Sequence, residues 1–200
     1  MTTRPADLSH FLLGALAELA HRAPAGSPEL AVSRTLVSRI KTVGQPGQGA
    51  PEPLPEPLPV VDRWLGPASE LARTGPAAAV GIALAPLLPC LAFRRRKGAD
   101  PANAAFYDGH ANAMILGPGG IEERGDLWIG LTLMAPGTLY VDHDHPPEEV
   151  YLALTPGEWW NARVDWTDPG PEGLIYNPPG IRHAMRAGAT PFLALWFLPI

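Results

Sequence analysis

The chain begins with apolar side chains at the three- and four-residue steps of amphipathic helices. Between residues 8 and 22 they form one helical face after a candidate cap at Asp7; this face comprises Leu8, Phe11, Leu12, Ala15, Leu16, Leu19 and Ala20. A second helix is expected to begin at Ser27-Pro28-Glu29, a cap followed by a first-turn proline, and to end near Gly44. Its apolar side comprises Leu30, Leu36, Val37, Ile40 and Val43. The pattern predicts two packed helices.

Proline interrupts the helical pattern from about residue 45 to residue 59. This stretch contains PEPLPEPLP, and proline at every second position is incompatible with a helix or a central strand, so we expect an extended linker. Beyond it, a short helix is expected from Val60 to Leu71 and an interrupted one from Ala77 to Leu91. Residues 1–100 are therefore predicted to form a helical N-terminal region that contains the linker near 45–59.

After Pro101 the pattern changes to short apolar runs separated by glycine and proline turns. The runs are Ala113 to Leu116, Leu127 to Met134, Glu149 to Leu154, Leu174 to Asn177 and Leu193 to Phe197. Such runs are typical of an antiparallel barrel or sandwich. We expect most tryptophans of this half to line its core or a cavity; they are Trp128, Trp159, Trp160, Trp166 and Trp196. The fold class predicted is α+β, with the helical half packed on an antiparallel β-barrel formed by residues 101–200.

Composition narrows the class of protein. The 200 residues are 46% hydrophobic and 18% charged, which indicates one globular unit. A net charge of -5 gives no reason to expect binding to nucleic acid or to an acidic membrane. Neither the N-terminus nor the proline-broken run from Gly75 to Phe93 resembles a membrane segment. The single Cys90 is expected to be a buried thiol. Together these features make the cytoplasm the expected location. The basic run Arg94–Lys97 is expected to be a solvated edge, with an anion or nucleic-acid contact as the alternative.

Histidines and one carboxylate cluster in the strand-rich half. His143 and His145 are two residues apart, so in a strand they project to the same side. After the bend forced by Pro146-Pro147, Glu149 and Tyr151 are two residues apart and again share one face of a strand. Because Glu148 would face the other side, Glu149 is the preferred ligand. His183 follows the turn at Pro178-Pro179-Gly180, where a barrel could return it to the same site. The remaining three histidines, His10, His21 and His110, are expected to be satisfied polar residues.

Three imidazoles and a carboxylate form a nitrogen and oxygen ligand set. His143, His145, Glu149 and His183 could together hold one divalent ion. Such a set accepts zinc, iron, manganese, cobalt or nickel, and the sequence leaves the choice among them open.

The spacing of these residues resembles the two cupin motifs. Gly137, five residues, His143-x-His145, three residues and Glu149 match the first motif, and Pro178-x-Gly180-x-x-His183 resembles the second. Seven residues rather than six separate Glu149 from Gly157, and no asparagine follows His183, but neither departure removes a ligand. Within the cupins, these ligands combined with Tyr140 and Tyr151, and with His183 thirty-four positions after Glu149, are similar to the dimethylsulfoniopropionate lyases.

The resemblance implies a double-stranded β-helix and a small zwitterionic sulfonium substrate. Lyases of this family split dimethylsulfoniopropionate into dimethyl sulfide and acrylate by β-elimination. A metal would bind the substrate carboxylate as a Lewis acid, and Tyr151 would be the general base, because a nearby dication lowers the pKa of a phenol. Tyr140 is expected to assist, but it lies three residues from His143, so a bulge would have to turn it towards the site. Aromatic faces suit a sulfonium, and the candidates are Trp128, Trp159, Trp160 and Trp196, of which Trp128 and Trp196 are preferred.

Two other functions remain open from the sequence. An iron-dependent dioxygenase would use the same ligands without needing Tyr151, and a non-catalytic cupin would bind a small molecule without turnover. The native metal is open, and the protein is expected to be a monomer or a homodimer.

Overall fold

Helices fill the first part of the chain and strands the second. The structure, a computed structural model, describes residues 3–47 and 57–200. The helices are α1 (Ala6–Arg22), α2 (Pro28–Arg39), α3 (Pro59–Thr74), α4 (Ala78–Leu84), the 3₁₀ helix η1 (Ala85–Cys90) and α5 (Ala104–Tyr107). The strands are β1 (Gln45–Pro46), β2 (Phe93–Arg94), β3 (His110–Leu116), β4 (Glu122–Glu123), β5 (Leu127–Met134), β6 (Leu139–His143), β7 (Glu149–Ala153), β8 (Glu158–Asn161), β9 (Val164–Thr167), β10 (Leu174–Asn177), β11 (His183–Arg186) and β12 (Phe192–Pro199). The α+β class predicted from the sequence is confirmed.

The first two helices form where the apolar periodicity predicts them, but their ends differ. Pro5, not Asp7, is the N-cap of α1, so Asp7 lies in the first turn, where its charge suits the helix dipole. In α2 the Ser27 hydroxyl accepts the first-turn N–H as expected. This helix ends at Arg39 rather than near Gly44. Val37, expected on its apolar side, is 42% exposed because α2 packs through other positions.

The later helical segments are also longer or less buried than expected. The helix expected over Val60 to Leu71 extends from Pro59 to Thr74, and the interrupted one is α4 followed by η1. Cys90, expected to be buried, is exposed because it ends η1 just beyond the packed part of that helix. The proline-rich stretch expected as a linker lies mainly outside the described residues, apart from residues 45–47, which include β1, and residues 57–59, of which Pro59 begins α3.

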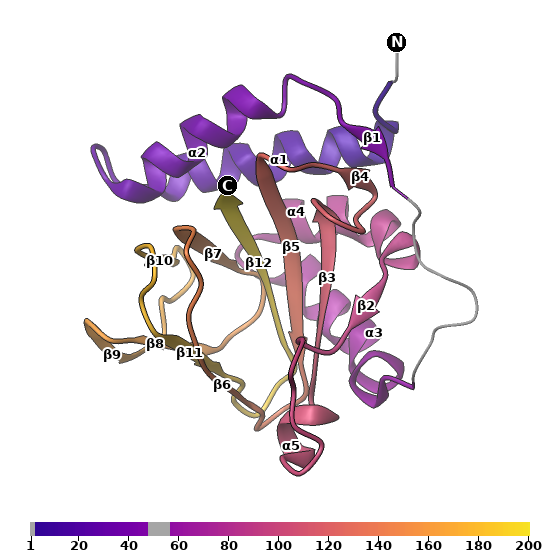
Figure 1. The fold of residues 1–200 in the computed structure, drawn as a ribbon, viewed down its shortest axis with the longest axis vertical. Helices are drawn as coiled ribbons and strands as arrows, with labels where there is room; N and C mark the ends of the chain where they lie inside the picture. Colours follow the sequence, from indigo (N-terminus) through magenta and orange to yellow (C-terminus); the bar gives the residue numbers. More distant parts are fainter. Residues whose placement is uncertain (1–2, 48–56) are drawn as a thin grey trace.

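Two facing sheets form the strand-rich part. In the described ranges, 3–47 and 57–200, one sheet has eight strands in the order β1-β4-β3-β5-β12-β7-β10, with β2 paired to β3, and the other has four in the order β6-β11-β8-β9. All pairings are antiparallel except a single parallel contact between β3 and β4. Figure 1 shows the long strands β3, β5 and β12 running together through the centre of the molecule.

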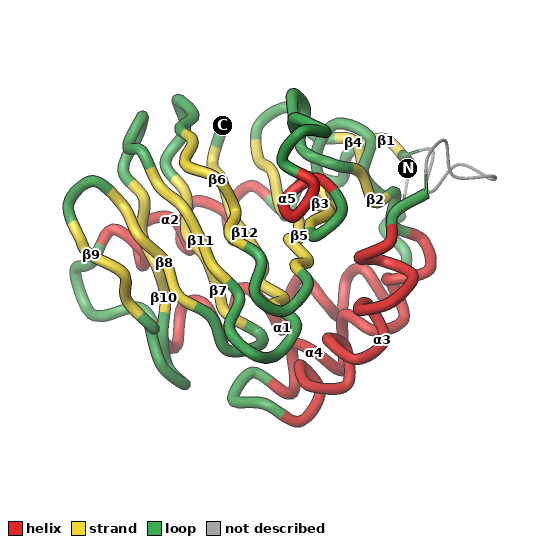
Figure 2. The backbone as a smooth tube through the Cα atoms, turned by 90° about the horizontal axis from the view of Figure 1, so that it is seen from below, coloured by secondary structure: helices red, strands yellow, loops and turns green. Residues whose placement is uncertain are grey.

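The large sheet has one face towards the helices and the other towards the small sheet. Along β5, Leu131 and Leu133 pack into the core shared with the helices, whereas Thr132 between them lines a cavity on the other face. On β7 the same alternation buries Val150 against the helical side and directs Tyr151 into the cavity. Figure 2 shows α3 and α4 on the opposite side of the large sheet from β6, β8, β9 and β11.

A buried charge network ties the N-terminal segment to the sheet. The Arg4 guanidinium donates two hydrogen bonds, of 2.6 and 2.8 Å, to the carboxylate of Glu122 on β4. Arg124 donates to the same carboxylate at 3.2 Å, as does the backbone N–H of Gly44 at 2.9 Å. Burial alone would raise the pKa of Glu122, but these donors and charges lower it.

Among the described helices, none combines the length and the apolar composition that crossing a membrane requires.

Candidate metal centre

Three of the four residues predicted as metal ligands meet between the two sheets. Glu149 begins β7, His183 begins β11, and His145 lies in the turn that follows β6. The Nε2 atoms of His145 and His183 each lie 3.3 Å from Oε2 of Glu149. One donor atom from each residue lies within 4.8 Å of the others, a separation that a single ion could bridge. Glu149 and His183 are buried, and His145 is partly exposed.

The backbone fixes which nitrogen each imidazole presents. Nδ1 of His143 lies 2.9 Å from the Val141 carbonyl, Nδ1 of His145 lies 3.0 Å from that of Pro147, and Nδ1 of His183 lies 2.9 Å from that of Ile181. A carbonyl only accepts, so each neutral ring carries its proton on Nδ1 and leaves the Nε2 lone pair free.

This arrangement fits a bound metal. A second hydrogen-bonding partner that fixes the tautomer is the usual support of metal-binding imidazoles. Nε2 of His183 is buried and has no hydrogen-bond partner within the described chain, a cost that a coordinated cation would remove.

His143, the fourth predicted ligand, lies beside this group rather than inside it. It pairs directly with His183 across β6 and β11, and the two ring centroids are 4.1 Å apart. Its centroid lies 6.3 Å from that of His145. Burial and the neighbouring His183 lower the pKa of His143 to about 4, which keeps it in the neutral form that a metal requires.

Glu149 and Glu148 point to different sides of β7, as strand parity predicts. Glu148 accepts a hydrogen bond from the Tyr176 hydroxyl at 2.8 Å, away from the histidines. Glu149 accepts one from the Asn177 side-chain amide at 3.3 Å, in addition to its histidine contacts. Burial would raise the pKa of Glu149, but His145 and His183 lower it to about 2, so the carboxylate is ionised.

Tyr140 and Tyr151 both line the cavity next to the histidines. The register between β6 and β11 shifts: His143 pairs with His183, whereas Tyr140 pairs with Met185. Three residue steps on β6 are thus matched by two steps on β11. This irregularity is what the sequence required for Tyr140 to share a side with His143. The two rings are 5.0 Å apart.

A short hydrogen-bonded chain holds the Tyr140 hydroxyl. Nδ2 of Asn112 donates to the Tyr140 oxygen at 2.9 Å, and the Thr132 hydroxyl donates to Oδ1 of Asn112 at 2.7 Å. Asn112 and Thr132 are direct partners in the β3–β5 ladder. Sequence reasoning missed both, although two polar side chains on inward positions of apolar strands are the signal that could have identified them.

Both tyrosines resist ionisation when the site holds only protein. Burial raises the pKa of Tyr140 to about 12, although the hydrogen bond from Asn112 acts in the opposite direction. Burial and the Glu149 charge raise the pKa of Tyr151 well above its usual value. A phenolate at either position therefore needs a nearby positive charge.

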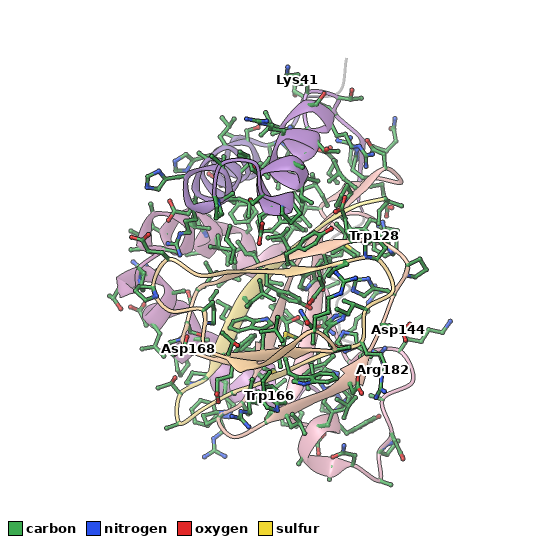
Figure 3. All side chains as sticks on the ribbon, turned by 90° about the vertical axis from the view of Figure 1, so that its left-hand side faces the viewer. Lys41, Trp128, Asp144, Trp166, Asp168 and Arg182 are labelled. Carbon is green, nitrogen blue, oxygen red and sulfur yellow. The ribbon has the colours of Figure 1, made fainter. Side chains whose placement is uncertain are left out.

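The cavity that these side chains share has a volume of about 450 Å³. Trp128 and Trp196, the tryptophans predicted to contact the substrate, both line it, together with Met114. Figure 3 shows Trp128 and Asp144, which also lines the cavity, on the same side of the molecule. The missing side chain of Gly130 makes room for Trp196, because a Cβ there would lie 2.2 Å from the indole ring. The cavity thus joins polar and aromatic walls.

Trp159 and Trp160 are not among the residues that line this cavity. Trp159 is instead packed behind Tyr151, with ring centroids 6.1 Å apart, and against Phe192.

Comparison with known proteins identifies a family with the same fold. The family model described as dimethylsulfoniopropionate lyase matches residues 32–194. A protein named as the dimethylsulfoniopropionate lyase DddL, from Cereibacter sphaeroides, is 33% identical over 135 residues, 67% of this chain and 56% of that protein. The dimethylsulfoniopropionate lyase DddQ of Ruegeria pomeroyi is 34% identical over 103 residues, 50% of this chain and 48% of that protein. The chain thus spans about half the length of these relatives.

Solved structures extend the likeness over nearly the whole fold. The crystal structure of DddQ from Ruegeria pomeroyi superposes with a TM-score of 0.68 at 24% identity, covering 99% of this chain and 93% of that one. A structure described with the lyases RdDddP and RnDddQII gives a TM-score of 0.70 at 20% identity, with 98% and 93% covered. The helices followed by two facing antiparallel sheets are the cupin architecture expected from the sequence.

Proposed function

Because the chain belongs to the dimethylsulfoniopropionate lyase family, we propose that it cleaves dimethylsulfoniopropionate to dimethyl sulfide and acrylate. The observation that carries this proposal is that Tyr140 and Tyr151 line the same cavity as His145 and Glu149. A β-elimination needs a base for the proton alpha to the carboxylate and a group that makes this proton acidic. The cavity offers candidates for both.

We assign one divalent metal to His143, His145, Glu149 and His183. The three Nε2 lone pairs and the ionised carboxylate support this assignment, and such a donor set suits zinc, iron, manganese, cobalt or nickel. When bound, the ion supplies Lewis acidity that withdraws charge through the substrate carboxylate and stabilises the phenolate form of a neighbouring tyrosine.

The protein's own side chains then carry the elimination. The Tyr151 oxygen removes the alpha proton, and the electron pair of that C–H bond forms the double bond between the alpha and beta carbons. The bond from the beta carbon to sulfur breaks, and dimethyl sulfide leaves as a neutral molecule with the electron pair of that bond. Tyr140, whose hydroxyl accepts a hydrogen bond from Asn112, lies beside His143 and assists Tyr151 as a second general acid–base group. Trp128 and Trp196 provide aromatic faces for the sulfonium.

The test is headspace gas chromatography of dimethyl sulfide from purified, metal-loaded protein. We expect the wild type to release it, and Tyr151→Phe to lower kcat by about a hundredfold or more, the usual contribution of a general base, with unchanged metal content. Tyr176→Phe is the matched control, since that hydroxyl is bonded to Glu148 outside the cavity.

A wild type that releases no dimethyl sulfide with any of the five metals would refute the lyase. Oxygen uptake would then test the dioxygenase alternative.

A further inference from the structure

The basic run Arg94–Lys97 divides into three environments. Its two end residues are exposed, as expected for a solvated edge. Arg95 is committed to protein contacts: Nε donates to the Tyr107 carbonyl at 2.7 Å, and the guanidinium lies 4.1 Å from the centre of the Tyr107 ring. All four residues of the run line the cavity that contains Tyr140, and Arg96 does so from a half-buried position. The run therefore forms a basic part of the cavity wall.

The backbone of Arg96 is fixed relative to Tyr140. The Arg96 N–H donates to Nε2 of His110 at 2.9 Å, while Nδ1 of His110 bonds to the Phe106 carbonyl. The His110 ring stacks on that of Phe106, with centroids 3.7 Å apart, and meets Tyr140 edge-on at 5.2 Å. Nε2 can accept from the Arg96 N–H only in the neutral ring, and burial lowers the pKa of His110 to about 4. These contacts of His110 fix the backbone of Arg96, and so the position of its Cα, next to Tyr140.

The Arg96 guanidinium has no hydrogen-bond or ion-pair partner within residues 3–47 and 57–200. Glu149, the buried carboxylate of the cavity, is already engaged by His145, His183 and Asn177. A half-buried guanidinium without a counter-ion is costly unless a ligand supplies the acceptor. The position thus favours an anion in the cavity.

We propose that Arg96 binds the carboxylate of the substrate and thereby orients it in the cavity. Guanidinium N–H groups match carboxylate oxygens in geometry and charge. The wall formed by Met114, Trp128 and Trp196 has no carboxylate and suits the sulfonium end. The choice of dimethylsulfoniopropionate as substrate rests on the proposed function, but recognition of a short aliphatic carboxylate does not require turnover.

The test is isothermal titration calorimetry of the full chain, at one fixed metal loading, with propionate and with its neutral analogue propionamide. We expect Arg96→Gln to raise the Kd for propionate about tenfold to a hundredfold, as losing a charged hydrogen bond does, with no change for propionamide. Arg96→Lys should recover part of the affinity. Arg94→Gln, which removes the same charge from an exposed residue that also lines the cavity, should change the Kd by less than about twofold, because a solvated charge contributes little.

Three results would overturn the proposal: no propionate binding by the wild type, an unchanged Kd in Arg96→Gln, or an equal loss in Arg94→Gln, which would indicate only a general positive potential. Propionate binding that depends on Arg96 without release of dimethyl sulfide would refute the lyase and leave the carboxylate site standing. The two failures are therefore distinguishable.

Discussion

Nε2 of His183 and Oε2 of Glu149 face each other at 3.3 Å, although Nδ1 of His183 is committed to the Ile181 carbonyl. With Nδ1 as the donor, Nε2 of His183 and the carboxylate are both acceptors, so a cation between them would turn their repulsion into two favourable contacts. The contact is thus the structural reason to treat this pair as the centre of a metal site.

Metal binding should depend on this pair. We expect the wild type to bind about one divalent ion per chain, whereas His183→Ala and Glu149→Gln lose it, because removing one ligand of a site costs much of its affinity. Elemental analysis after dialysis measures the content, and the rise in Tm on adding zinc or cobalt gives a second readout. His21→Ala on the exposed end of α1 is the control. Full metal content in both site variants would contradict the assignment.

The Asn112 amide should tune Tyr140. Replacing it by leucine in Asn112→Leu removes the donor to the phenol, so the pKa of Tyr140 should rise further and kcat should fall about tenfold, as expected for one lost hydrogen bond. Thr132→Val, which releases Oδ1 of Asn112, should give a smaller loss of the same kind.

Two measurements report the pKa of Tyr140 in these variants: the dependence of kcat on pH, and the ultraviolet absorbance of tyrosinate during a pH titration. Thr35→Val on α2 serves as the remote control. Variants with a reduced kcat but an unmoved pH profile would indicate a purely structural role.

Burial of neutral His110 should make stability depend on pH. Its folded pKa, about 4, lies below the ordinary value of 6.5, so the unfolded chain takes up the proton first as the pH falls. Stability from this group is full above about pH 6.5 and is lost progressively down to about pH 4, by up to about 3 kcal/mol. Comparing the free energy of unfolding of wild type and His110→Gln across this range measures it. Parallel curves for the two proteins would refute the prediction.

The Gly130 position should not accept a side chain. A Cβ would lie 2.2 Å from the Trp196 ring and 2.5 Å from the Ala113 carbonyl oxygen, so Gly130→Ala should cost about 1–3 kcal/mol of unfolding free energy and displace the indole from the cavity wall. Denaturant unfolding and the KM measure the two effects. Gly14→Ala, on the exposed face of α1 with no neighbour within 4 Å, should instead stabilise by about 0.5–1 kcal/mol.

The buried Glu122 network should be essential to the docking of the N-terminal segment. Glu122→Gln leaves two arginines, Arg4 and Arg124, without their shared carboxylate, and we expect a loss of about 3–5 kcal/mol in unfolding free energy. Chemical denaturation provides the measurement. Glu70→Gln, which breaks the exposed pair with Arg73, should cost less than about 1 kcal/mol. Similar losses in the two variants would contradict this view of the network.

The sequence alone determined the features that depend on local backbone geometry. Helical periodicity located α1, and apolar runs bounded by turns gave β5 and β10 their observed ends. Strand parity distinguished Glu149 from Glu148, because successive side chains on one strand alternate faces whatever lies around them.

Only the tertiary structure decided what depends on pairing between distant segments. The register shift that brings Tyr140 to the side of His143 arises between β6 and β11, and the Asn112–Thr132 pair arises between β3 and β5. Similarly, four basic residues that look alike in the sequence all line the cavity but differ in their surroundings: Arg94 and Lys97 are exposed, Arg95 is held by Tyr107, and Arg96 is half-buried. Exposure, hydrogen-bond partners and charge surroundings are set by residues far away in the chain, and a local pattern carries no information about them.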